Sequence, residues 1–220
     1  MIAASRGAAT IEAPAPVLLH VDPWLVVADK PSGLLSVPGR GADKQDCLAA
    51  RVQAVYPDAL SVHRLDMETS GLIVMARGKA AHRALSMAFE RRQVEKRYVA
   101  VVAGALSEEA GEIDLPLICD WPNRPRQMVD FARGKPSLTR FRRLGAETAG
   151  SRLALYPITG RSHQLRVHLA AIGHPILGDA LYADPLARQA APRLLLHADW
   201  LALNHPETGE RMEFTCPPPF

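Results

Sequence analysis

The sequence of 220 residues has few cysteines and no long apolar run. Its three cysteines, Cys47, Cys119 and Cys216, lie far apart and form no CxxC pair, which argues against a disulfide framework and a structural zinc site. No apolar stretch is long enough to span a bilayer, so we expect no membrane partner. The N-terminus lacks the cationic start and apolar run of a secretory signal. These absences favour a reduced, cytoplasmic setting.

Repeats, low-complexity linkers and an extreme composition are also missing. Apolar residues make up 48% of the chain and charged residues 22%, which is the balance of an ordinary globular protein rather than of a disordered or collagenous one. The length favours one domain over two small ones. We interpret residues 1–16, rich in Ala and Pro, as a loose lead-in, and residues 17–220 as the folded domain.

The hydrophobic pattern predicts mainly short strands with a few helices. Strands are expected over 17–28 with an interruption at Asp22-Pro23, and over 72–76, 98–103, 194–203 and 211–215. Helices are expected over 46–56, 79–92 and 162–172. Short strands between Gly and Pro turns should fill 104–160, and 36–45 and 183–192 should be loops. This order favours an α+β fold with a mixed, largely antiparallel sheet and a few flanking helices.

The net charge of +3 is small, but basic residues are concentrated locally. Residues 121–143 contain seven of them and a single acid, Asp130. A second cluster consists of Arg91, Arg92, Lys96 and Arg97. Each cluster alone is typical of a solvated charged face. Two clusters that flank a polar, motif-like segment favour a polyanionic substrate, which Arg can bind through phosphate forks and base stacking.

The polar segment 63–71 is one candidate site. If it is extended, Arg64 and Asp66 project to one side and Leu65 to the other, so that Leu65 enters the core while the charged pair faces a cleft. Two alternatives stay open from these residues alone. Asp66 could cap the backbone of a surface turn. It could also hold Mg²⁺ together with Glu68, as in a nuclease.

A second dense segment, 160–168, has helical spacing. Leu165 and Leu169 should be buried, while His163 and Arg166 share the other face, so that Arg166 is available to a carboxylate elsewhere. The alternative is an exposed Arg without a role. A zinc site at His163 and His168 is disfavoured, because this spacing turns the two rings roughly 140° apart around a helix.

An ordered set of motifs resembles the RluA-type pseudouridine synthases. The matching segments are 30–34, 63–66 with 69–71, 96–100, 160–168, 173–179 and 195–198. The resemblance implies a pseudouridine-synthase catalytic domain. Because the first motif begins near the N-terminus, we expect no S4-like RNA-binding domain before it. The implied reaction detaches uracil from its ribose, turns it and rejoins it through carbon, with no redox step, so no cofactor and no metal are expected.

The resemblance also implies roles for individual residues. Asp66 is the essential carboxylate, Arg166 is the cation that keeps it ionised in a closed pocket, and Tyr98 packs on the uracil ring. Arg64 enters the RNA where the target base leaves the stack. The remaining implied substrate contacts are His63, Thr69, Arg124, Arg126, Arg161 and Leu196. The hydroxyls of Thr69 and Ser70 are expected to bond to backbone groups and stiffen the Asp66 loop, and Gly71 is expected to supply a conformation or close approach that other residues disfavour. Whether Asp66 attacks the ribose, attacks the base or removes a ribose proton stays open.

Residues 114–125 resemble members of this family that modify both transfer RNA and ribosomal RNA. The expected substrates are therefore the anticodon stem-loop of tRNA and a hairpin of 23S rRNA, bound by base flipping of a loop nucleotide. A monomer is expected. Three alternatives remain. The enzyme could carry out the same chemistry on only one of these RNAs, the protein could be the metal-dependent nuclease described above, or it could be a non-catalytic RNA-binding factor.

Overall fold

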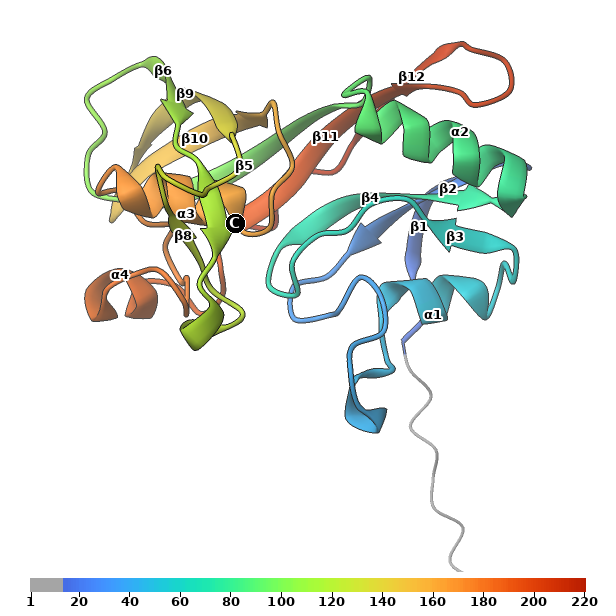
Figure 1. The fold of residues 1–220 in the computed structure, drawn as a ribbon, viewed down its shortest axis with the longest axis horizontal. Coiled ribbons are helices and arrows are strands. Elements are labelled where there is room, and N and C mark those ends of the chain that lie inside the picture. Colours follow the sequence, from blue (N-terminus) through green and yellow to red (C-terminus); the bar gives the residue numbers. More distant parts are fainter. Residues whose placement is uncertain (1–13) are drawn as a thin grey trace, which may run out of the picture.

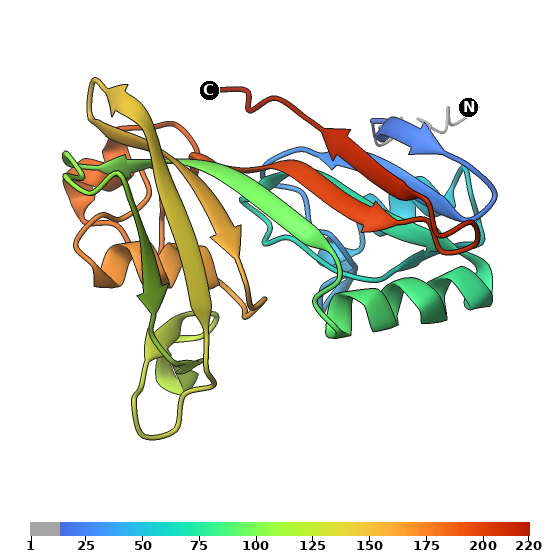
Figure 2. The same cartoon turned by 90° about the horizontal axis from the view of Figure 1, so that it is seen from above.

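The computed structural model describes residues 14–220, in which ten strands form one mixed sheet (Figures 1 and 2). The order of its main path is β1-β2-β4-β11-β5-β10-β9-β6, with β12 beside β11 and β3 beside β4. Every pair is antiparallel except β4 with β11. A second, small sheet pairs β7 with β8. The predicted mixed, largely antiparallel α+β fold is confirmed.

The strands are β1 Val17–Val21, β2 Leu25–Lys30, β3 Ala59–Ser61, β4 Ser70–Arg77, β5 Glu95–Ala103, β6 Ala110–Asp114, β7 Leu117–Cys119, β8 Gln127–Val129, β9 Leu138–Glu147, β10 Gly150–Pro157, β11 Leu196–Asn204 and β12 Arg211–Thr215. The α-helices are α1 Leu48–Gln53, α2 Gly78–Glu90, α3 Gln164–Ala171 and α4 Pro185–Gln189. Two short 3-10 turns lie at Ala42–Lys44 and Trp121–Asn123. None of these helices, in the part of the chain described, is long and apolar enough to cross a membrane.

Strands β5 and β11 run through the middle of the molecule and join two halves (Figure 1). One half contains β1 to β4, α1 and α2, and its apolar core includes Leu25, Val74 and Leu85. The other contains β6, β9, β10 and α3, and its core includes Leu153 and Leu169. The sheet thus continues across two separate cores, and side chains from both halves can meet at its centre.

The register of the three central strands brings distant motifs together. Ser70 and Gly71 of β4 lie opposite His197 and Ala198 of β11, and Ala198 lies opposite Tyr98 of β5. Gly71 has φ 108°, and a Cβ there would come 2.3 Å from the carbonyl oxygen of Ala198. Only glycine allows this close approach, so the role expected of Gly71 is confirmed.

Most predicted elements are present, with three differences. Helix α1 covers only Leu48–Gln53 instead of 46–56, because Cys47 caps its first turn and Asp46 remains outside, paired with Arg51. Strands β9 and β10 are longer than the short strands expected over 104–160. The predicted loop 183–192 contains α4, which begins with an Asp184 cap followed by Pro185. The predicted lead-in 1–16 lies mostly outside the described residues.

Candidate active site

A cavity of ~1010 Å³ is lined by side chains from both cores. Its volume is at the upper limit of typical small-molecule pockets, about 300–1,000 Å³, so it has room for a segment of a polymer. All of the predicted site residues except Arg124 and Arg126 line it: His63, Arg64, Asp66, Thr69, Tyr98, Arg161, Arg166 and Leu196. The two candidate segments 63–71 and 160–168 therefore meet in one place.

Lys30, at the end of β2, holds the loop that carries Asp66. Its side chain is 0% exposed, and its Nζ donates to the carbonyl oxygens of Pro31 at 2.9 Å, Leu34 at 2.7 Å and Met67 at 2.9 Å. Burial lowers the pKa of Lys30 to about 8. Sequence reasoning found the motif that contains Lys30 but gave the side chain no role, because its acceptors become neighbours only through folding.

Two serines extend this support along the same loop. The Oγ of Ser32 donates to the carbonyl oxygen of Glu68 at 2.7 Å. The Oγ of Ser36 donates to the carbonyl oxygen of Leu65 at 2.7 Å and accepts from the Leu65 N–H at 3.1 Å. The backbone on both sides of Asp66 is thus fixed by residues 30–36, which favours a constant orientation of its side chain.

The alternation predicted for residues 64–66 is confirmed. Leu65 is buried in the first core, while Arg64 is exposed and Asp66 is partly exposed at the cavity wall. Glu68 is not among the residues that line this cavity, so within residues 14–220 the two carboxylates do not face the same site. This placement weakens the interpretation as a magnesium-dependent nuclease.

Arg166 is buried more deeply than its helical position predicted. All of residues 164–169 are buried, so the face that was expected to be free is covered as well as the face of Leu165 and Leu169. Arg166 is 3% exposed, and its guanidinium forms two hydrogen bonds of 2.7 Å with Asp179. Its Nη1 also lies 3.7 Å from Oδ2 of Asp66. Arg166 therefore lies between two carboxylates: Asp179 is the close partner and Asp66 the more distant one.

Burial opposes the charge of Arg166, but the hydrogen bonds to Asp179 and the negative charges of Asp179 and Asp66 together outweigh burial and raise the pKa of Arg166. The guanidinium therefore remains a fixed positive charge beside Asp66. Sequence reasoning missed Asp179 as a functional residue. The available signal was the motif 173–179, which ends at this residue, while its contact with Arg166 depends on the tertiary fold.

Tyr98 and Leu196 lie on the two central strands, at the level of Asp66. Burial and the charge of Asp66 raise the pKa of Tyr98, so its phenol stays protonated. Leu196 is 3% exposed, lies opposite Ala100 and still lines the cavity. Together they give the cavity an aromatic and an aliphatic surface, which suits the flat ring of a nucleobase.

His63 and Thr69 differ in how well their polar atoms are paired. The Nε2 of His63 accepts from the Val74 N–H at 2.9 Å, its ring stacks on Phe89 at 4.4 Å, and burial lowers its pKa to about 3. His63 is thus a neutral support of the cavity. The buried Oγ1 of Thr69 has no hydrogen-bond partner within the described residues. The expectation that this hydroxyl bonds to the loop backbone is wrong.

Ser70 links the Asp66 loop to the C-terminal part of the chain. Its Oγ forms a hydrogen bond of 2.8 Å with Nδ1 of His197 and accepts from Nη2 of Arg193 at 2.5 Å. The other ring nitrogen of His197 bonds to the carbonyl oxygen of Cys216 at 2.9 Å. The hydroxyl of Ser70 therefore stiffens the site through side chains, not through the loop backbone as expected.

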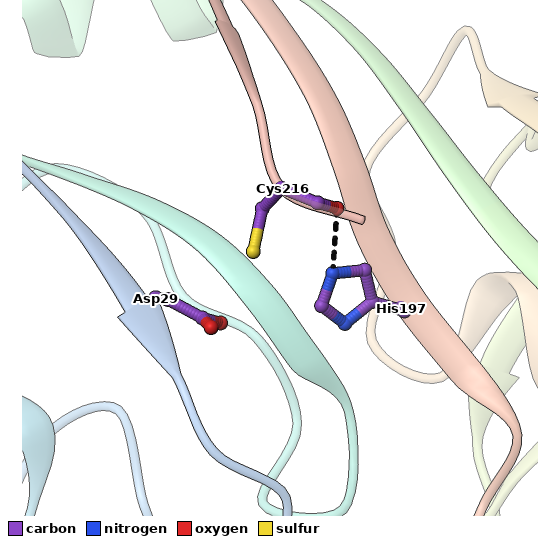
Figure 3. Close-up of side chains that lie close together, drawn as sticks. All are labelled: Asp29, His197 and Cys216. Atoms are coloured by element: carbon purple, nitrogen blue, oxygen red, sulfur yellow. Dashed lines mark hydrogen bonds between the residues drawn. The ribbon is translucent and has the colours of Figure 1, made fainter. Parts of the chain in front are cut away.

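Asp29, His197 and Cys216 bring possible metal-ligand atoms within 4.8 Å of one another (Figure 3). Both nitrogens of His197 are already hydrogen bonded, to Ser70 and to the backbone of Cys216. Burial and the neighbouring Asp29 raise the pKa of the Cys216 thiol to about 12. The thiol thus keeps its proton, and the geometry is that of a hydrogen-bonded contact between β2, β11 and the C-terminal segment.

The basic segment 121–143 is divided in space. Arg124 and Arg126 lie on the β7–β8 hairpin, where the guanidinium of Arg124 stacks 3.3 Å from the ring centre of Trp121. Arg140 lies on β9 and forms an ion pair of 2.7 Å with Glu112. The locally basic segment is therefore partly neutralised, since strand pairing with β6 supplies an acid that the local sequence does not contain.

The second basic cluster lies closer to the site. Arg92, Lys96 and Arg97 line the cavity, and Arg97 is paired with Asp199 at 2.6 Å. Arg161 is exposed at the same cavity. Basic side chains thus outnumber the acidic ones, Asp66, Glu90 and Glu95, among the residues that line the cavity, as expected for a polyanionic ligand.

Comparison with known proteins identifies the family of this chain. Residues 24–171 match the family model described as RNA pseudouridylate synthase. The chain belongs to the RNA pseudouridylate synthase family. It is 54% identical, over 93% of its length and 94% of the relative's, to the dual-specificity RNA pseudouridine synthase RluA of Escherichia coli K12. It is 53% identical to the protein of the same name from Yersinia pestis, over 91% of this chain and 98% of that one.

Solved structures of the family show the same fold. Human RNA pseudouridylate synthase domain containing 1 superimposes with a TM-score of 0.77 at 29% identity, covering 98% of this chain and 87% of that one. A second human protein, RNA pseudouridylate synthase domain containing 4, gives a TM-score of 0.73 at 28% identity, over 92% of this chain and 88% of that one. The predicted single pseudouridine-synthase domain is confirmed, and the enzyme is a member of an RNA isomerase family.

Proposed function

We propose that this pseudouridine synthase converts uridine to pseudouridine in the anticodon stem-loop of tRNA and in a hairpin of 23S rRNA, with Asp66 as its essential carboxylate. The observation that carries the proposal is the position of Asp66 in the cavity, with the buried cation of Arg166 3.7 Å away and Tyr98 beside it. The name shared by the relatives, dual-specificity RNA pseudouridine synthase, supports two kinds of RNA substrate.

The proposed reaction is an isomerisation. The bond between N1 of uracil and C1′ of ribose breaks, and a bond between C5 and C1′ forms. The proton on C5 leaves and N1 gains one, so the product has the same atoms as the substrate. Asp66 must be ionised to take part as a nucleophile or as a base, and the fixed charge of Arg166 favours that form.

The target nucleotide must leave its stack to reach Asp66, at a cost of a few kcal/mol. A loop of a hairpin reduces this cost because its bases are already partly unstacked. Arg64 is exposed at the cavity and can fill the space that the base leaves. Tyr98 and Leu196 would then contact the flipped uracil, and the hydroxyl of Thr69, which has no partner among residues 14–220, would meet a polar atom of the nucleotide.

Cations around the cavity would bind the RNA backbone without reading its sequence. We assign this role to Arg161 at the cavity and to Arg124 and Arg126 on the hairpin. His63 would act by shaping the cavity. We also propose that the enzyme acts as a monomer, since residues of one chain line the cavity. A cytoplasmic location follows from the proposed RNA substrates.

The test is release of tritium from C5 of uridine in two transcribed RNAs, a tRNA anticodon stem-loop and hairpins of 23S rRNA, in the presence of EDTA. We expect release from both kinds of RNA without strand cleavage. Release from only one would restrict the substrate. Activity that disappears with EDTA, or cleavage of the RNA, would instead support a metal-dependent nuclease. Tight binding of both RNAs without release would support a binding factor.

A further inference from the structure

His163 has a backbone conformation that its side chain does not favour. It precedes α3 with φ 54° and ψ 16°, in the left-handed region, and its side chain caps no helix N–H. Residues other than glycine are uncommon in this conformation, although histidine is among those that adopt it more readily, and such conformations cluster at functional sites. Helix capping does not explain why a histidine stands here.

The left-handed turn directs the imidazole to Asp66. Its Nε2 lies 3.9 Å from Oδ1 of Asp66, on the opposite oxygen from the one that faces Arg166. The other ring nitrogen, Nδ1, is 2.6 Å from the hydroxyl of Tyr182, and the two rings meet edge to face at 5.6 Å. The imidazole therefore lies between Tyr182, to which it is hydrogen bonded, and the carboxylate, which it faces at a distance longer than a hydrogen bond.

The hydroxyl of Tyr182 determines where the proton of His163 lies. The backbone N–H of Gln127 donates to this oxygen at 2.8 Å, so the phenolic proton is free to be donated to Nδ1 of His163. Because Nδ1 accepts, the proton of the neutral imidazole is on Nε2, the atom that faces Asp66. Burial lowers the pKa of His163, which favours the neutral ring.

We propose that His163 and Tyr182 are positioning residues for the reaction: Tyr182 selects the His163 tautomer whose Nε2–H faces Asp66, and this second donor holds the carboxylate toward the uridine. The inference rests on the proposed function and adds two residues to it. The positive charge of Arg166 stabilises the ionised carboxylate at Oδ2, and the Nε2–H of His163 orients the carboxylate at Oδ1. Both supports touch Tyr182, whose ring centre lies 5.1 Å from the guanidinium carbon of Arg166.

The same tyrosine connects the site to the β7–β8 hairpin. Gln127 begins β8, and the guanidinium carbon of Arg126 lies 5.4 Å from the Tyr182 ring centre. The hairpin that carries Arg124 and Arg126 therefore contributes to the support of Asp66. RNA bound to these arginines would rest against the element that fixes the orientation of His163.

The test is the single-turnover rate of tritium release from the anticodon stem-loop, measured beside RNA affinity. Tyr182→Phe keeps the ring on Arg166 but removes the hydroxyl. We expect the rate to fall by about tenfold, the usual effect of one lost hydrogen bond, while the Kd for RNA stays within about twofold. Tyr56→Phe is the matched control, because Tyr56 stacks on Arg77 outside the cavity and should keep the full rate.

His163→Gly separates the side chain from the backbone. Glycine accepts the left-handed conformation, so the variant should fold with at least wild-type melting temperature and still lose about tenfold in rate. The double variant His163→Gly/Tyr182→Phe should be no slower than His163→Gly, since Tyr182 acts through His163. If Tyr182→Phe folds poorly, the rate of His163→Gly against the wild type decides the matter alone, because this variant keeps Tyr182.

Three outcomes would overturn the inference: full rates in both single variants, additive losses of rate in the double variant, or a loss confined to the Kd for RNA. The proposed function would stand in each case, provided that the wild type releases tritium. Absence of tritium release by the wild type from every RNA would overturn the proposed function and this inference together.

Discussion

Asp179 holds the guanidinium of Arg166 through two hydrogen bonds of 2.7 Å, and both side chains are almost completely buried. Arg166 also approaches Asp66, but only to 3.7 Å. The cation next to the proposed essential carboxylate is thus fixed by a different carboxylate before any RNA binds. Such a preorganised charge needs no rearrangement during the reaction, which is the condition for effective electrostatic stabilisation.

Asp179→Asn should reduce both stability and activity. The change leaves the buried charge of Arg166 without its ionic partner, and the loss of one partner of a buried pair costs about 3–5 kcal/mol. Urea unfolding would measure this loss. Glu112→Gln is the control, because its pair with Arg140 is exposed and should contribute less than about 1 kcal/mol. Equal decreases in the free energy of unfolding in the two variants would contradict the conclusion that the buried Arg166–Asp179 pair matters more than an exposed pair.

Thr69→Val should leave stability unchanged or slightly higher, because the buried hydroxyl that it removes has no partner among residues 14–220. We expect the rate of tritium release to fall by about tenfold if this hydroxyl contacts the nucleotide. Ser70→Ala should instead lower the melting temperature, since the Ser70 hydroxyl is bonded to His197 and Arg193. A normal rate in Thr69→Val would remove Thr69 from the substrate contacts.

RNA affinity should fall steeply with salt, because phosphate contacts release counterions. Arg124→Ala should reduce the slope of log Kd against log salt by about 1, as expected for one lost phosphate contact. Arg152→Ala should leave the slope close to that of the wild type, since Arg152 lies outside the cavity and is already paired with Glu147. Fluorescence anisotropy at several salt concentrations would measure both slopes. Identical slopes in the wild type and Arg124→Ala would exclude Arg124 from the RNA contacts.

Stability should decrease as the pH falls below about 6.5, in part because of His63. Burial lowers the pKa of His63 to about 3, whereas in the unfolded chain it titrates near 6.5. Between these values the unfolded state binds one more proton, so the free energy of unfolding falls with falling pH by up to ~1.4 kcal/mol per pH unit. His63→Gln removes this contribution and should show a shallower slope in urea unfolding at pH 5, 6 and 7. Parallel slopes would show that His63 titrates alike in both states.

Local sequence patterns predicted the elements better than the contacts of the site. Strand β12 has the bounds that its alternation indicated, and Leu65 enters the core as the pattern of residues 64–66 required. Helix α4 was missed although Asp184 followed by Pro185 is a typical helix start. In α3, periodicity could not reveal that Arg166 is buried, because both faces of this helix are covered.

The contacts that fix the site join residues far apart in the chain. Lys30 bonds to Met67, Ser70 to His197, and Tyr182 to Gln127. Each pair forms only because the sheet order brings its segments together, and no local spacing records that order. The family resemblance located the motifs that contain Lys30, Ser70 and His197, but it did not include Met67, Tyr182 or Gln127, and it did not indicate which atoms bond to which.

The most direct test of the account compares Asp66→Asn with the wild type on the anticodon stem-loop, with EDTA present. The substitution is nearly isosteric and removes the charge that faces Arg166 and His163. RNA affinity should stay within about twofold while tritium release from C5 disappears, because the reaction needs an ionised carboxylate. Release at the wild-type rate by Asp66→Asn would contradict the assignment of Asp66, and with it the proposed mechanism.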